Sequence, residues 1–165
     1  MAGSGKPKGG ERRSESTDLG VLAGRLLFSV QNELYRKLRE MGFDDIAPRH
    51  GAVFAYLPAE GIRATELARL SGQHKQVIGK SVDELETLGY VERRPDPDDR
   101  RAKLVVPTSR GLAQMQASDA IMAEIGERHR RSLGAKAYAA FLADFNQVVD
   151  HQRASTAGDV PVEAQ

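Results

Sequence analysis

The sequence contains no cysteine and no long apolar run. Without cysteine there is no disulfide, no thiolate nucleophile and no cysteine-based zinc site, and nothing conflicts with a reducing compartment. Every apolar run falls far short of the ~20 residues that a membrane-spanning helix needs. Basic and acidic residues number 24 and 23, so the net charge of +1 does not by itself indicate a nucleic-acid partner. These absences predict a cytoplasmic protein, not bound to a membrane, whose function depends on how its charges are distributed.

Length and composition favour one globular domain with two loosely structured ends. The chain is 40% hydrophobic and 28% charged, and its 165 residues suit a single core. Its first ten residues are rich in Gly, Lys and Pro without an apolar run, so no secretory signal or anchor is expected there. We expect a flexible basic arm over residues 1–16 and a loose tail over residues 153–165, because neither segment has enough apolar side chains to offset the entropy of ordering.

Helical periodicity dominates the region between these ends. Apolar residues recur at spacings of three and four, and glycines stand where left-handed helix ends are expected. The predicted helices run from Asp18 to about Gly42, over His50–Leu57 after Pro48, over Thr65–Leu70, over His74–Leu88 before Gly89, and over two segments after Gly111 that meet near Gly134.

After Gly89 the sequence pattern changes from the spacing of a helix to the two-residue alternation of a β-strand. The runs Tyr90–Arg94 and Ala102–Val106 are rich in β-favouring residues, and the polar, turn-forming segment Pro95–Arg101 separates them. This pattern predicts a β-hairpin with a charged tip.

A short helix, a turn at Gly72 and a longer helix have the spacing of a helix-turn-helix, and the hairpin that follows gives its winged form. If Ile78, Val82 and Leu85 form the buried stripe, the opposite face presents amide and ammonium groups to base edges and phosphates. The hairpin adds guanidinium groups suited to phosphates and to a narrow minor groove. The predicted DNA-binding residues are Thr65, Lys75, Gln76, Val77, Gly79, Lys80, Arg93, Arg94, Arg100, Arg101 and Lys103. The alternative is a solvated helix face and a surface turn with exposed ion pairs.

Four segments together resemble the MarR family of winged helix-turn-helix transcriptional regulators. They are Ala64–Ala68, Val82–Arg93, which contains Leu-Gly-Tyr-Val-Glu-Arg, the wing Asp98–Val105, and Thr108–Gly111. The resemblance spans about Asp18 to His151 and implies a winged-helix homodimer whose first helix and last two helices form the dimer interface. One departure is that Gly72–Gln76 lacks the usual Ser/Thr-rich stretch, so base preference does not carry over.

The resemblance also implies roles for single residues. Asp83 matches a position that pairs with a wing arginine, here Arg101. Small effectors of the family, often anionic aromatics, bind between the dimerisation helices and the DNA-binding lobe, where Arg25, Arg49 and His50 are candidate ligands for a carboxylate. The alternative is that Arg25 is an exposed helix residue and His50 a packing residue.

The expected fold is mainly α with a small β-hairpin wing, a winged helix-turn-helix lobe plus a helical dimerisation region. We expect the first dimerisation helix and a connecting helix in residues 17–60, the DNA-binding lobe in residues 61–110, and the C-terminal dimerisation helices in residues 111–152.

The leading functional hypothesis is a homodimeric, sequence-specific DNA-binding regulator, a repressor of an inverted-repeat operator in double-stranded DNA, released by a small effector. The alternative is a winged-helix protein–protein interaction module without specific DNA binding. Steep salt dependence would distinguish the first from the second.

No enzyme, metal site or cofactor is expected. The sequence has no nucleophile–base pair, paired-carboxylate motif or cofactor fingerprint. Its histidines also lack metal-ligand spacing: they are His50, His74, His129 and His151.

Overall fold

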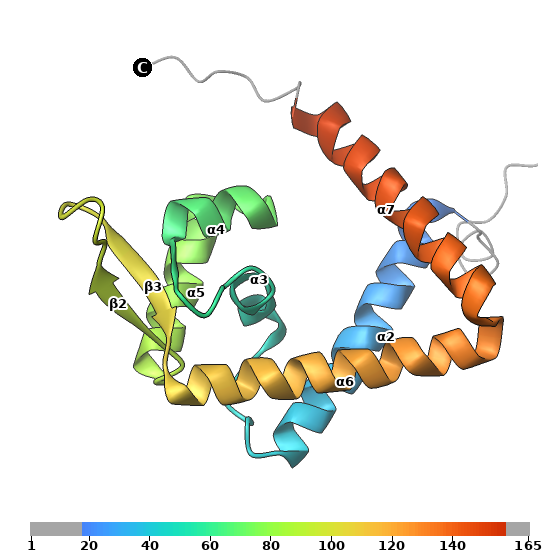
Figure 1. Ribbon diagram of the computed structural model, residues 1–165, viewed down its shortest axis with the longest axis horizontal. Helices are drawn as coiled ribbons and strands as arrows, with labels where there is room; N and C mark the ends of the chain where they lie inside the picture. Colours follow the sequence, from blue (N-terminus) through green and yellow to red (C-terminus); the bar gives the residue numbers. More distant parts are fainter. Residues whose placement is uncertain (1–17, 158–165) are drawn as a thin grey trace, which may run out of the picture. The chain divides into compact units, whose positions relative to one another are not determined.

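The computed structural model describes residues 18–157, and in this range the chain is mainly α with one small antiparallel sheet (Figure 1). The predicted arm and the last part of the predicted tail lie outside the described residues. In chain order the elements are α2 (Leu19–Glu40), η1 (Pro48–His50), α3 (Gly51–Phe54), β1 (Ile62–Arg63), α4 (Ala64–Ser71), α5 (Lys75–Thr87), β2 (Val91–Pro95), β3 (Lys103–Pro107), α6 (Ser109–Leu133) and α7 (Ala135–Ala157). None of these helices is long and apolar enough to cross a membrane.

The chain divides into two units between Ile121 and Met122, within α6. The first contains α2 to β3 and the start of α6. The second contains the rest of α6 and α7, where Phe141 and Phe145 stack with ring centroids 5.7 Å apart.

The helix boundaries follow the local signals in the sequence. Asp18 caps α2 by accepting hydrogen bonds from the Gly20 and Val21 amides at 2.9 and 3.2 Å. Gly72 ends α4 and Gly89 follows α5, with φ values of 67° and 76° that favour glycine. The long helices and the helix-turn-helix spacing are therefore confirmed.

Two helices differ in extent from the expectation. The helix predicted over His50–Leu57 is a 3-10 turn followed by α3, which ends at Phe54, four residues before Pro58. A residue before proline disfavours helical geometry. At the other end α7 continues to Ala157, inside the segment 153–165 predicted as a tail, because no glycine or proline occurs before Gly158.

The predicted hairpin is part of a three-stranded sheet of order β1-β3-β2. Strand β1 has only two residues, too few to give a periodic signal, and Ile62 pairs with Val105. The hairpin strands each lie one residue later than predicted, because Val91 pairs with Pro107 and Pro95 pairs with Lys103. The tip therefore begins at Asp96 rather than at Pro95.

Tyr90 joins the end of α5 to the wing and to α6. Its side chain is fully buried, and its hydroxyl donates to Asp45 at 2.6 Å. Its ring meets Phe54 edge-on at 5.9 Å, and the Arg110 guanidinium lies 4.2 Å from the ring centroid. Burial and the bond to Asp45 raise the pKa of the Tyr90 hydroxyl.

The Thr-x-x-Gly motif at the start of α6 docks that helix on Tyr90. The Thr108 hydroxyl donates to the Gly89 carbonyl at 2.6 Å and accepts from the Gly111 amide at 3.1 Å, while the Thr108 amide donates to the Tyr90 carbonyl at 3.0 Å. A Cβ at Gly111 would collide with that carbonyl oxygen. Glycine at position 111 therefore permits the close approach of α6 to Tyr90.

We expect Gly111→Ala to lower the free energy of unfolding by about 2–3 kcal/mol, because backbone atoms must move apart. Gly79→Ala is the matched control: its Cβ would meet nothing within 4 Å, and alanine favours α5 by about 0.5–1 kcal/mol. Urea denaturation of both variants measures the difference, and equal stabilities would contradict the close-approach argument.

Candidate nucleic-acid interface

The first turns of α5 have one buried face and one polar, exposed face. Ile78, Val82 and Leu85 are buried as predicted, and Ser81 joins them by donating to the Arg49 carbonyl at 3.2 Å. The opposite face exposes Lys75, Gln76, Val77 and Lys80, while Gly79 is partly covered. This face offers ammonium and amide groups, which can donate hydrogen bonds to base edges in the major groove.

Two further predicted residues extend this exposed surface. Val77 is 47% exposed, which leaves its methyl groups available for contact with a thymine methyl. Thr65 is exposed in the first turn of α4.

The wing tip is a closed turn that carries exposed cations. The Asp96 amide donates to the Ala102 carbonyl at 3.1 Å, and the Ala102 amide donates to the Asp99 carbonyl at 2.9 Å. Arg100 and Arg101 are exposed at this tip, and Lys103 is exposed at the start of β3. Within residues 18–157, none of these three side chains forms an ion pair, and the same is true of Lys75 and Lys80.

The arginine that ties the wing to α5 is Arg93, which corrects the predicted Asp83–Arg101 pair. Arg93 Nη2 donates to Asp83 at 2.5 Å, and its Nη1 pairs with Glu86. Burial opposes the charge, but the two carboxylates outweigh it and raise the pKa of Arg93. Arg93 lies in the middle of β2 beside α5, whereas Arg101 lies in the tip beyond the ends of both strands. Strand register therefore decides the partner.

Arg94 also differs from the other predicted wing residues. It is exposed but forms an ion pair with Glu92 on the same strand. A phosphate contact by Arg94 would have to compete with that neighbour.

One tie at the wing has no local signal in the sequence. Arg63, at the end of β1, donates from Nε to Asp96 Oδ2 at 2.6 Å, and its Nη2 forms an ion pair with the same oxygen at 2.6 Å. Asp96 is only 5% exposed. The contact joins residues 33 positions apart, and strand β1, which supplies Arg63, is too short to predict.

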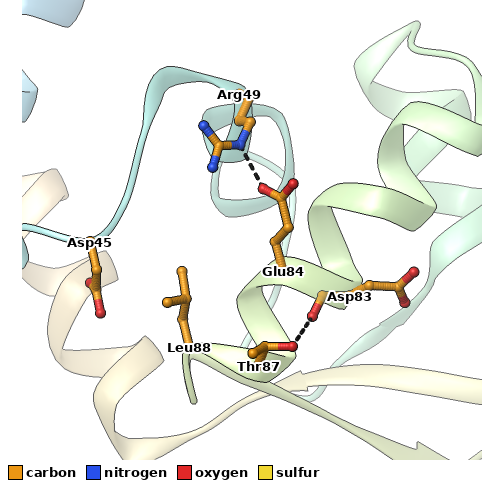
Figure 2. A pocket seen from close by; sticks show the side chains of 6 residues that line it. All are labelled: Asp45, Arg49, Asp83, Glu84, Thr87 and Leu88. Atoms are coloured by element: carbon orange, nitrogen blue, oxygen red, sulfur yellow. Dashed lines mark hydrogen bonds and ion pairs between the residues drawn. The ribbon is translucent and has the colours of Figure 1, made fainter.

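A second ionic cluster lies at the other side of α5, beside a pocket of about 340 Å³. The lining residues are Asp45, Arg49, Asp83, Glu84, Thr87 and Leu88. In Figure 2, Glu84 points toward Arg49 whereas Asp83 points away from it. Glu84 accepts from Arg49 Nε at 2.6 Å and from His50 Nε2 at 2.9 Å. These bonds, that from Arg49 first, lower the pKa of Glu84 from 4.5 to about 2.

His50 is a buried structural residue, which corrects its predicted place in an effector site. It is 0% exposed, and its Nδ1 accepts from the Ala47 amide at 3.2 Å. A backbone amide can only donate, so Nδ1 carries no proton and the ring is the neutral tautomer that donates from Nε2 to Glu84. Both ring nitrogens are therefore occupied. Arg49 is bound to Glu84 as well but stays largely exposed, and Arg25 is exposed on α2.

Comparison with known proteins shows a likeness to one family. The MarR-family model matches residues 44–102, from the segment before η1 to the wing tip. CouR from Rhodococcus jostii RHA1, solved with p-coumaroyl-CoA, superposes with a TM-score of 0.64 at 27% identity over 91% of this chain and 100% of that chain. Over residues 44–102 the chain is similar to the MarR family.

Other MarR-family structures share the fold. The repressor CouR bound to a 23-mer DNA duplex superposes with a TM-score of 0.67 at 24% identity over 88% of this chain and 99% of that chain. Apo MarR from E. coli gives a TM-score of 0.61 at 24% identity over 81% and 98%. No curated protein sequence matches the chain. The solved structures that share this fold include a transcriptional regulator of the MarR family and a transcriptional repressor bound to DNA.

We expect Glu84→Gln to destabilise the lobe that contains α5 in a pH-dependent way. The pKa of Glu84 is lowered in the folded state, so its stabilising effect is complete above its ordinary value of 4.5 and is lost as the pH falls toward about 2. The difference in unfolding free energy from wild type should be constant near neutral pH and shrink below about pH 4.5.

Thermal or urea unfolding at a series of pH values measures this difference. Glu60→Gln is the matched control, since Glu60 is exposed and its carboxylate forms no ion pair in the described part of the chain. If Glu84→Gln lowers the free energy of unfolding by an amount that does not change with pH, the ionic role of Glu84 is contradicted.

Proposed function

We propose that the chain is a homodimeric transcriptional repressor that binds an inverted-repeat operator and is released by a small anionic effector. The observation that carries the DNA-binding mode is the exposed polar face on the first turns of α5, which follows the Gly72 turn and is backed by the core. In this proposal α5 enters the major groove, and the wing tip reaches the adjacent minor groove.

The proposed contacts fall into two groups. Lys75, Gln76 and Lys80 meet base edges and phosphates from α5, with Gly79 and Val77 allowing close approach and Thr65 of α4 contacting the backbone. The wing contributes Arg100, Arg101 and Lys103, with Arg94 beside them. We assign Arg93 to bracing, because its side chain already binds Asp83 and Glu86.

Exposed apolar side chains on the dimerisation helices support a homodimer. On α2 they include Leu22, Leu26 and Phe28, of which Phe28 is 65% exposed. In the second unit Phe141, Leu142 and Val148 of α7 are also exposed. Apolar patches of this kind mark association surfaces, and a two-fold symmetric dimer would cover them with identical patches of the partner.

An anionic effector is supported by exposed cations and by a solved relative. CouR is solved with p-coumaroyl-CoA, an anionic compound with an aromatic group. Arg25 and Arg49 are the exposed cations that we assign to such a ligand, and His50 is left out because it is buried.

Selection from random duplex DNA tests the repressor proposal. We expect an inverted repeat with half-sites ~10 bp apart, because two-fold protein symmetry requires two-fold sites. Affinity should fall with salt at a slope of about −0.9 per neutralised phosphate. A motif without a dyad would contradict the dimer, and absence of salt-dependent duplex binding would favour the protein-interaction alternative.

Lys80→Ala should weaken binding to the selected operator by about tenfold and reduce the salt slope by about one, because one phosphate contact is lost. Lys136→Ala on α7 is the control, because it removes one exposed positive charge from a residue outside the helix-turn-helix and the wing. If the two variants bind alike, Lys80 lies outside the interface. Fluorescence anisotropy at several salt concentrations gives both quantities.

Titration with a panel of phenolic and aromatic acids tests the effector. An acid that binds should raise the melting temperature of the protein and weaken its binding to the operator. A saturating concentration of operator should lower the affinity for the acid by the same factor. Arg25→Ala and Arg49→Ala should reduce its affinity, whereas Lys136→Ala should not. Equal affinity for all three variants and wild type would remove both arginines from the effector site.

A further inference from the structure

The Arg63–Asp96 pair reaches across the whole sheet. Arg63 is the last residue of edge strand β1, and it pairs with Leu104 of the central strand. Asp96 directly follows β2, the other edge strand, whose Arg94 pairs with the same Leu104. The Arg63 guanidinium therefore crosses β3 to reach the carboxylate at the start of the wing tip.

Arg63 also stands at the start of the helix-turn-helix. It is the cap residue of α4, in extended conformation, and directly precedes Ala64 and Thr65. The pair thus links the beginning of α4 to the beginning of the wing tip. One of these segments precedes α5 in the sequence and the other follows it, and both take part in the proposed DNA-binding mode.

Asp96 organises the tip with its remaining groups. Its Oδ1 accepts from the Asp98 amide at 2.9 Å, and its own amide donates to the Ala102 carbonyl. Asp99 Oδ1 accepts from the Arg101 amide at 3.0 Å. Backbone hydrogen bonds first, and then the bond from Arg63, lower the pKa of Asp96, so it is a carboxylate at neutral pH. The backbone that carries Arg100 and Arg101 is therefore fixed by a buried anion.

We propose that Arg63 and Asp96 are a positioning pair that holds the wing tip in register with the helix-turn-helix, so that Arg100 and Arg101 meet DNA in a preset position. This role rests on the proposed DNA-binding function. A tip that is already ordered loses less conformational freedom on binding, so its contacts contribute more to affinity. Neither Arg63 nor Asp96 needs to touch DNA in this role.

The sign of the charge change separates positioning from simple electrostatics. Asp96→Asn removes a negative charge beside a polyanion, which by Coulomb's law alone would tighten DNA binding. The amide keeps the size of the side chain but cannot offer an anionic oxygen to both nitrogens of Arg63. Positioning therefore predicts weaker binding despite a more favourable net charge.

Asp98→Asn is the matched control. Asp98 is exposed, two residues from Asp96, and within residues 18–157 its carboxylate forms no hydrogen bond or ion pair. The substitution makes the same chemical and charge change without removing a hydrogen bond or ion pair of Arg63. It should bind the operator as tightly as wild type or more tightly.

The first measurement is operator affinity by fluorescence anisotropy. We expect Asp96→Asn to bind about fivefold or more weakly than Asp98→Asn, and Arg63→Lys to lie between wild type and Asp96→Asn, because lysine keeps the charge but offers one nitrogen instead of two. In the Asp96→Asn background, Arg63→Lys should have little further effect, because only the longer contact of Arg63 Nη2 with Asp99 at 3.8 Å remains. Binding of Asp96→Asn as tight as that of Asp98→Asn would overturn the proposal.

The second measurement needs no DNA. Amide hydrogen exchange followed by NMR should accelerate about tenfold or more at Asp98 and Ala102 in Asp96→Asn, while the amides of Leu85 and Val105 in the core keep their wild-type rates. Unchanged exchange at the tip would overturn the positioning role whatever the DNA result. If exchange at the tip is faster in Asp96→Asn but the wild-type chain binds no duplex, the result would support the structural role of the Arg63–Asp96 pair and refute the proposed DNA-binding function.

Discussion

The junction at Tyr90 fixes the relation between α5, the wing and α6. Its buried ring, its hydroxyl on Asp45 and its carbonyl, which accepts from Thr108, bring three elements to one residue. Gly89 allows the chain to leave α5 with a positive φ, and Gly111 allows α6 to approach the Tyr90 backbone. Because packed cores do not deform continuously, a displacement of α6 must be transmitted to Tyr90 and from there to α5 and β2.

Helix α5 carries its basic residues in the first half and its acidic residues in the second half, and the acidic residues have cationic partners on neighbouring elements. Lys75 and Lys80 lie in its first half, while Asp83, Glu84 and Glu86 lie in its second half. Carboxylates near a helix C-terminus are disfavoured by the helix dipole. Here external cations offset that effect, since Arg93 binds Asp83 and Glu86, and Arg49 binds Glu84. The acidic half of α5 thereby becomes its anchor to the lobe, and the basic half remains exposed.

The sequence predicts those parts of the molecule whose signals are local. Apolar spacing located α2, α4, α5 and the later helices, and the exposed face of α5 follows from the same periodicity because Ile78, Val82 and Leu85 must be buried together. Strand β1 has two residues and carries no period. The partner of Asp83 depends on hairpin register, which placed Arg93 rather than Arg101 beside it. The sequence could not show that His50 is a packing residue. Its burial and its bond to Glu84 depend on the packing of η1 against α5, and its other partner is the backbone amide of Ala47.

The small net charge is compatible with DNA binding because internal pairs occupy many of the cations. Arginines such as Arg49, Arg63 and Arg93 are bound to carboxylates that hold the lobe together. In the described part of the chain, Lys75, Lys80, Arg100, Arg101 and Lys103 form no ion pair, and they lie at the start of α5 and at or beside the wing tip. A phosphate that meets one of these five side chains need not displace a carboxylate first, so counterion release contributes to affinity without loss of an internal pair. The distribution of paired and unpaired cations, rather than their total, therefore distinguishes this surface from the rest of the lobe.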